Sequence, residues 1–200
     1  MLLAHIAGSP GAGKTYLGNQ LIKRMRGKVK MIELDPIREK IVQSPKYKKA
    51  FNRLSRKAKV SQGDLRALAN LYNSILAINL KKRLKGSKPV ILIGIIDVQI
   101  GGKFFFFDID QLDPVFKLFL EVPLDRLIKQ YIDREVDRVC ENKPKIKKLL
   151  YEGEFGINIS KDRVLFNYEF DLKEYVKKRD YSAMNSEEII RLIQKYLDRK

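Results

Sequence analysis

The strongest chemical signal in the sequence is a glycine-rich segment close to its beginning. Residues 8–15 have the sequence GSPGAGKT, which satisfies the pattern G-x-x-x-x-G-K-[ST] in full. Glycines let successive backbone N–H groups turn inward around a phosphate, and the positive end of the following helix strengthens the attraction. The pattern predicts that Lys14 contacts the β- and γ-phosphates of a nucleotide and that the Thr15 hydroxyl binds Mg²⁺. The expected nucleotide-binding residues are Gly8, Ser9, Pro10, Gly11, Ala12, Gly13, Lys14 and Thr15.

Carboxylates at the ends of two later apolar stretches are candidates for the rest of the chemistry. Asp35 is a candidate to accept the proton of an attacking hydroxyl or to hold a water on Mg²⁺, and the alternative is an ordinary capping side chain. Asp97 is the candidate to bind Mg²⁺ through water. Asp108, which follows four consecutive phenylalanines, is the alternative residue for that role.

Three arginines are candidates to bind the reacting phosphates. Arg134 and Arg138 lie four residues apart on one face of a predicted helix, where a transferring phosphate would offset their mutual repulsion. The alternative is pairing within the helix, of Arg134 with Asp137 and of Arg138 with Glu141. Arg38 is the candidate to hold a phosphate of the acceptor substrate.

Other notable side chains have structural interpretations. His5 lies inside the first apolar stretch and is expected to be a buried structural histidine, and Cys140 is expected to pack in a core. The phenylalanine run 104–107 is also expected to be packing, and the alternative is that one or two of its rings stack on a base. The lone cysteine excludes an intramolecular disulfide framework and a Cys-based zinc site, and it favours a reducing, cytoplasmic location. The apolar runs are far shorter than the ~20 residues that a membrane-spanning helix needs.

The pattern of the whole chain predicts an α/β fold. Apolar runs predict strands at 2–7, 29–35, 90–97 and 116–122, with a further short strand at 164–166, and the N-terminal run is a strand rather than a signal peptide. Helices are expected after residue 15, across 46–85 with Ser61 as a cap, from Pro123 onward, and from Asn185 or Ser186 to the end. Gly101 and Gly102, with the phenylalanines at 104–107, indicate a hairpin or an excursion at the sheet edge. Strands alternating with helices predict a doubly wound parallel sheet of about five strands.

The order of these features resembles that of the small P-loop kinases: nucleoside and nucleotide monophosphate kinases, with shikimate-kinase-like and zeta-toxin-like relatives. The resemblance is carried by residues 8–15, by residues 33–35 with Arg38, by the helical insertion, and by residues 119–127, which run on to Arg134 and Arg138. It implies one domain over 1–200 that uses ATP and Mg²⁺, with a helical substrate-binding arm at about 38–88 and a lid at about 134–160. The sequence departs from the family in lacking the D-G pair after the third strand and the usual lid glycine.

The charge of the chain is strongly asymmetric. The formal net charge is +17, and residues 38–88 contain fifteen basic side chains against only Glu39 and Asp64. Such a surface faces polyanions or is simply solvated lysine. The leading hypothesis is an ATP-dependent phosphotransferase that acts on a nucleotide, a nucleoside or a similar small phosphate acceptor. The alternatives are a polynucleotide 5′-end kinase and a nucleic-acid-associated NTP-binding protein, both of which would use the basic arm.

Overall fold

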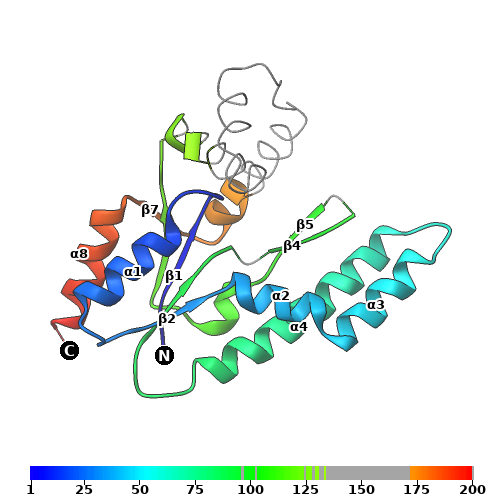
Figure 1. The fold of residues 1–200 in the computed structure, drawn as a ribbon, viewed down its shortest axis with the longest axis horizontal. Helices are drawn as coiled ribbons and strands as arrows, with labels where there is room; N and C mark the ends of the chain where they lie inside the picture. Colours follow the sequence, from blue (N-terminus) through cyan, green and yellow to red (C-terminus); the bar gives the residue numbers. More distant parts are fainter. Residues whose placement is uncertain are drawn as a thin grey trace, which may run out of the picture.

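A five-stranded parallel sheet forms the centre of the molecule (Figure 1). The computed structural model describes residues 1–95, 97–101, 103–123, 125–127, 129–130, 133 and 172–199. The strand order is β2-β3-β1-β6-β7, and every neighbouring pair is parallel. The predicted sheet of about five parallel strands is therefore confirmed. Its strands are β1 (Leu2–Gly8), β2 (Lys30–Glu33), β3 (Val90–Ile93), β6 (Phe116–Leu120) and β7 (Ser182–Met184).

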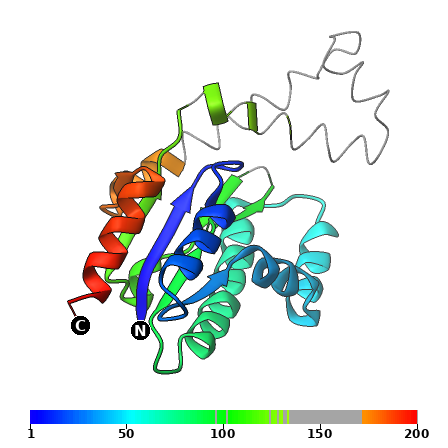
Figure 2. The ribbon, with the colours of Figure 1, turned by 60° about the vertical axis from the view of Figure 1, so that its left-hand side comes forward.

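Helices cover both faces of this sheet, which gives the doubly wound arrangement (Figure 2). Helices α1 (Lys14–Arg24) and α8 (Ser186–Leu197) pack on one face. Helices α2 (Asp35–Gln43) and α4 (Gln62–Arg83) pack on the other. Alternate residues of β3 enter the two cores, so its four residues are all buried. A continuous apolar run is the expected composition for a strand covered on both faces.

The third predicted strand is wrong in its extent, because the chain leaves the sheet at Gly94. Strand β3 ends at Ile93, and Asp97 begins β4 (Asp97–Ile100), which pairs antiparallel with β5 (Lys103–Phe106). Gly94 has φ 127°, and a Cβ there would lie 2.9 Å from the Leu34 Cβ atom. Only glycine fits this turn, and it divides an apolar run that periodicity alone joins into one strand. The predicted hairpin around 101–107 is thereby confirmed as β4–β5.

The second predicted strand is also too long at its carboxyl end. Strand β2 stops at Glu33, and Asp35 belongs to the first turn of α2, which the sequence pattern did not predict. In the sequence, Pro36 is expected to end the strand. Proline lacks an N–H and fixes φ near its helical value, so it is also common in the first turn of a helix.

Two helices between β2 and β3 build an arm that extends away from the sheet (Figure 1). They are α3 (Pro45–Ser55) and α4, which confirms the predicted helical region at 46–85. The predicted cap is also confirmed: the Ser61 side chain accepts from the Asp64 backbone N–H, and the Asp64 carboxylate accepts from the Ser61 N–H. This reciprocal capping fixes the start of α4 near the tip of the arm.

The β4–β5 hairpin packs against the helical residues 172–178. Phe106 stacks on Tyr175 with ring centroids 4.7 Å apart, and Phe107 is buried. The phenylalanine run is thus a packing element, as expected. A 3-10 helix, η1 (Ile109–Leu112), follows the hairpin.

Several predictions fall on residues that the structure does not describe. These are the lid at 134–160, the strand at 164–166, and the side chains Arg134, Arg138 and Cys140. The strand β7 was not predicted, although the cap of the following helix at Asn185 was, and it is confirmed. Among the described residues, no helix combines the length and the apolar character needed to cross a membrane.

Candidate phosphate-binding site

The loop between β1 and α1 lies at the carboxyl end of the central strand. β1 is flanked by β3 on one side and β6 on the other, and the connections leaving β1 and β3 run to opposite sides of the sheet. In open α/β sheets, ligands bind in the crevice at such a switch point. The topology therefore places residues 8–15 where a parallel sheet binds its ligand.

The loop backbone has the form that an anion requires. Gly11 and Gly13 both have φ 81°, and Gly13 precedes α1 without any side-chain hydrogen bond to the first turn. The first N–H groups of a helix have no partner within the helix, so here they are available to a ligand. The Thr15 side chain lies in this first turn and is exposed.

The Lys14 ammonium group lies within the curve of the loop. Its Nζ atom donates to the Gly8 carbonyl at 2.8 Å and to the Ser9 carbonyl at 2.7 Å. Both acceptors belong to the loop itself, so the positive charge is held over the same backbone whose amides begin α1. This concentration of positive charge favours a bound phosphate.

Asp97, Arg38 and Asp35 form an ionic cluster near this loop. Arg38 Nη2 lies 2.9 Å from Asp97 Oδ1, and Arg38 Nη1 lies 3.5 Å from Asp35 Oδ1. Asp97 is buried, and this burial raises the pKa of its carboxyl group, while Arg38 and Lys14 oppose the rise. The structure thus brings together Lys14, Asp35, Arg38 and Asp97, although the strand that was expected to carry Asp97 ends earlier.

Asp108 has a different environment. Its carboxylate lies 2.8 Å from the Arg179 guanidinium and accepts from the Asp110 N–H at the start of η1. It is therefore occupied as a cap and an ion-pair partner. Asp97 differs from Asp108 in being buried, and its ion-pair partner is Arg38. The choice between Asp97 and Asp108 as the Mg²⁺ ligand stays a prediction.

His5 binds the turn at Gly94, through which the chain passes from β3 to Asp97. Its Nε2 atom lies 3.0 Å from the Gly94 carbonyl oxygen, which only accepts, so Nε2 carries the proton. Its Nδ1 atom accepts from the Tyr181 hydroxyl. The ring is fully buried, and desolvation lowers the pKa of His5 to about 4. The expectation of a buried structural histidine is confirmed.

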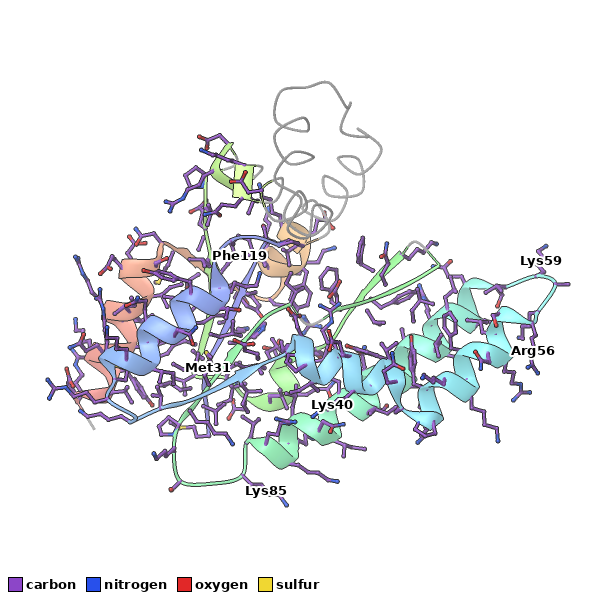
Figure 3. All side chains as sticks on the ribbon, viewed as in Figure 1. Met31, Lys40, Arg56, Lys59, Lys85 and Phe119 are labelled. Carbon is purple, nitrogen blue, oxygen red and sulfur yellow. The ribbon has the colours of Figure 1, made fainter. Side chains whose placement is uncertain are left out.

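A cavity of about 620 Å³ adjoins the loop on the side of β6 and β7. Phe119, at the carboxyl end of β6, lies beside the phosphate loop (Figure 3). Volumes of this order are typical of sites for small organic ligands. The walls of this cavity mix apolar side chains with charged ones such as Lys173 and Glu188. The sequence does not predict this cavity, because its walls come from strand ends that are far apart in the chain. Its lining includes Ser9, Ala12, Phe119, Val122, Asn185 and Glu188.

The described residues fit a nucleotide with Mg²⁺ better than a metal held by protein alone. The described part of the chain contains no group of three or more His, Cys, Asp or Glu side chains that could hold a metal ion. Mg²⁺ is usually bound through one or two protein groups together with substrate phosphates. Asp97 Oδ1 is buried and lies 2.9 Å from Arg38 Nη2, although within the described residues it accepts no hydrogen bond of good geometry.

Comparisons with known proteins bear on the fold. The chain is similar to the crystal structure of shikimate kinase from Bacteroides thetaiotaomicron, with 17% sequence identity over 98% of each chain and a TM-score of 0.50. It also matches shikimate kinase from Acinetobacter baumannii in complex with shikimate, with 12% identity over 100% of this chain and 96% of that one and a TM-score of 0.46. No protein-family model and no curated protein matches the chain. The first of these likenesses confirms the expected α/β fold, which the chain shares with that shikimate kinase structure.

Proposed function

We propose that this protein is an ATP-dependent phosphotransferase that phosphorylates a nucleotide, a nucleoside or a similar small phosphate acceptor. The observation that carries the proposal is the convergence of Lys14, Arg38 and Asp97 beside a helix N-terminus with open amide groups. The P-loop kinase fold supports the same reaction class. The cavity next to the loop has a volume sufficient for the nucleoside part of ATP.

Each residue would have a defined role in this reaction. Phosphoryl transfer depends on positioning and charge neutralisation, which Lys14 and the amides of α1 would supply at the β- and γ-phosphates. Thr15 would bind Mg²⁺ directly and Asp97 would bind it through water, and the ion would neutralise further phosphate charge. Arg38 would hold the acceptor. Arg134 and Arg138 remain proposed ligands of the transferring phosphate, from the sequence pattern.

The transfer step exchanges one bond to the γ-phosphorus for another. The acceptor hydroxyl oxygen forms a bond to the γ-phosphorus while the bond to the bridging oxygen breaks, and ADP leaves. The hydroxyl proton would pass to Asp35, whose side chain is 79% exposed beside Arg38 and so accessible to a substrate. Asp35 is therefore the proposed general base.

The decisive experiment is a transfer assay with ATP labelled at the γ-phosphate. Nucleosides, monophosphates, other small hydroxyl compounds and oligonucleotides are offered separately, and the compound that gains the label identifies the acceptor. We expect a small acceptor to be labelled and Lys14→Ala to abolish transfer. Calorimetry that reveals no affinity for Mg-ATP would overturn the proposal.

Asp35→Asn and Asp108→Asn form a matched pair for the proposed base. Each removes one carboxylate charge, but only Asp35 belongs to the cluster near the loop. We expect Asp35→Asn to reduce turnover by about 10²–10⁴-fold while Mg-ATP still binds, and Asp108→Asn to retain turnover. Normal turnover by Asp35→Asn would remove the base from the mechanism.

A further inference from the structure

A groove between α3 and α4 lies on the arm, apart from the phosphate loop. Its cavity measures about 540 Å³, and it includes none of the loop residues 8–15, Asp35, Arg38 or Asp97. Four cationic side chains line it, together with an aliphatic floor. The lining cations are Lys46, Lys49, Arg53 and Lys57, and the floor includes Ala50, Leu54, Leu68 and Leu71.

Three of these cations form a row without acidic partners. Lys46, Lys49 and Arg53 follow one another at intervals of three and four residues on α3, so they lie on one helix face about 5–6 Å apart. Within the described residues, none of them makes an ion pair. Like charges at this spacing destabilise a helix slightly. A row of this kind is therefore explained best by an anionic ligand that crosses it.

The one acidic residue of the groove is already neutralised. Asp64 binds Lys57 with 2.6 Å between Oδ1 and Nζ, and this contact together with the Ser61 cap lowers the pKa of Asp64 to about 2. Asp64 and Lys57 thus close the tip end of the groove as a pair. The remaining charge that faces a ligand is entirely positive.

The positive surface continues beyond the groove. Arg56 and Lys59 point outward at the tip of the arm, and Lys40 lies on α2 (Figure 3). Lys85 lies apart from the groove, beyond the far end of α4 (Figure 3). An extended anion that leaves the groove at either end would therefore meet further cations. A compact anion, such as a single phosphate, would use only a part of this surface.

We propose that the α3–α4 groove binds a single-stranded nucleic acid, with its phosphates on the row Lys46, Lys49 and Arg53. The spacing of the row suits successive phosphates of one strand, and the aliphatic floor suits the apolar faces of sugars and bases. Packed helices lie only about 8–10 Å apart, so the groove between them is too narrow for a duplex. The proposal does not depend on the phosphotransfer reaction, because binding in this groove requires no ATP.

The test measures binding of a fluorescein-labelled, mixed-sequence single-stranded oligonucleotide by anisotropy, without nucleotide and over a series of salt concentrations. The groove variant combines Lys46→Gln, Lys49→Gln and Arg53→Gln. The matched control combines Lys81→Gln, Lys82→Gln and Arg83→Gln, which removes the same charge from exposed positions at the end of α4. A duplex of the same sequence and polyglutamate are titrated in parallel.

We expect the single strand to bind the native protein most tightly. The groove variant should lose at least about tenfold in affinity at low salt, and its slope of log affinity against log salt should be shallower by about 2, from three lost contacts of about 0.7 each. The control variant should retain most of the affinity. Equal losses of affinity in both variants would show that the oligonucleotide is held by general charge attraction, and would overturn the proposed site in the groove.

Other outcomes also overturn the proposal. If the oligonucleotide does not bind at low salt, nucleic acid is excluded as the ligand of the groove. If the duplex binds with equal affinity, a preference for single strands is excluded. Polyglutamate that binds more tightly than the oligonucleotide, and that depends on the same three cations, would make the groove a site for an acidic protein segment. Circular dichroism of both triple variants establishes that they fold.

Discussion

Charged side chains gather both at the carboxyl end of the sheet and on the α3–α4 arm. In the first region the buried charge is paired, whereas in the second the cations are exposed. At the sheet end, Asp97 is buried against Arg38, and His5 is buried between the Gly94 carbonyl and the Tyr181 hydroxyl. On the arm, the cations are exposed and the row Lys46, Lys49 and Arg53 has no acidic partner in the described structure. Burial makes an unpaired charge prohibitively unstable, whereas water tolerates one at little cost.

This difference separates two kinds of site. A charge that must be paired to be buried is fixed in position, which suits a reaction centre. A charge that is left exposed and unpaired keeps its attraction for a mobile partner, which suits association. Substitutions at the sheet end should therefore affect stability strongly, and substitutions on the arm should affect it weakly.

The largest expected effect is that of removing Arg38. Arg38→Met leaves Asp97 buried without its cation, and we expect a loss of about 3 kcal/mol in the free energy of unfolding, measured in urea at neutral pH. The folded state raises the pKa of the Asp97 carboxyl through burial, so protonation relieves the loss and the deficit should shrink as the pH falls.

The control is a double variant. Adding Asp97→Asn to Arg38→Met removes the buried charge as well, and we expect it to recover a large part of the stability that Arg38→Met loses. If Arg38→Met alone is as stable as the native protein, the ion pair does not stabilise the sheet end. The expected difference in sensitivity between the sheet end and the arm would then be contradicted.

The next effect is a dependence of stability on pH that originates in His5. Its pKa is about 4 in the folded protein against 6.5 in an unfolded chain, so the unfolded state takes up the proton first as the pH falls below 6.5. The stability from neutral His5 is complete above pH 6.5 and declines toward pH 4. Between pH 7 and pH 5 we expect a loss of about 2 kcal/mol.

His5→Gln keeps a side-chain donor for the Gly94 carbonyl but does not titrate. Urea unfolding at a series of pH values should therefore give a flatter profile for His5→Gln between pH 7 and pH 5. Parallel profiles for the two proteins would mean that His5 is not the origin of the pH dependence.

A smaller contrast compares one glycine in each region. A Cβ at Gly18 in α1 would lie 2.3 Å from Ile93 Cδ1 and from Met31 Sδ, whereas a Cβ at Gly63 in α4 would approach only Ser61 Oγ, at 3.6 Å. We expect Gly18→Ala to destabilise by about 1 kcal/mol after its gain in helix propensity, and Gly63→Ala to be neutral or slightly stabilising. Thermal unfolding measures both, and a stabilising Gly18→Ala would contradict the close packing.

The smallest expected effect is on the arm itself. The groove variant Lys46→Gln, Lys49→Gln and Arg53→Gln should change the free energy of unfolding by no more than about 0.5 kcal/mol, in the stabilising direction, because it relieves repulsion. The change should vanish at high salt. A large destabilisation would show that these cations hold the arm together and are not reserved for a ligand.

The parts of the fold that the sequence predicts well are those with local causes. The phosphate loop is a continuous motif. The caps at Ser61 and Asn185 each depend on residues no more than three positions apart, and both caps are found where expected. The parallel sheet follows from the alternation of apolar runs and helical periods. These signals require no knowledge of which segments meet in space.

The errors arise where distant residues decide the local conformation. Gly94 turns out of the sheet because Leu34 leaves no room for a side chain and because His5 binds its carbonyl, and neither contact is visible in the run of residues 90–97. The ion pair between Arg38 and Asp97 joins α2 to β4, and the cavity beside the loop joins β6 to β7. The roles of the site residues remain predictions.

The length of α4 links the two regions mechanically. Its 22 residues extend about 33 Å, far beyond the four-residue strand β3 that it covers, so one rod spans both the sheet and the groove. From Asp64 to Arg83 the rod contains neither glycine nor proline, and Leu65 touches the β4–β5 turn at Gly101. The first turn of the helix that lines the groove therefore packs against the same hairpin that carries Asp97.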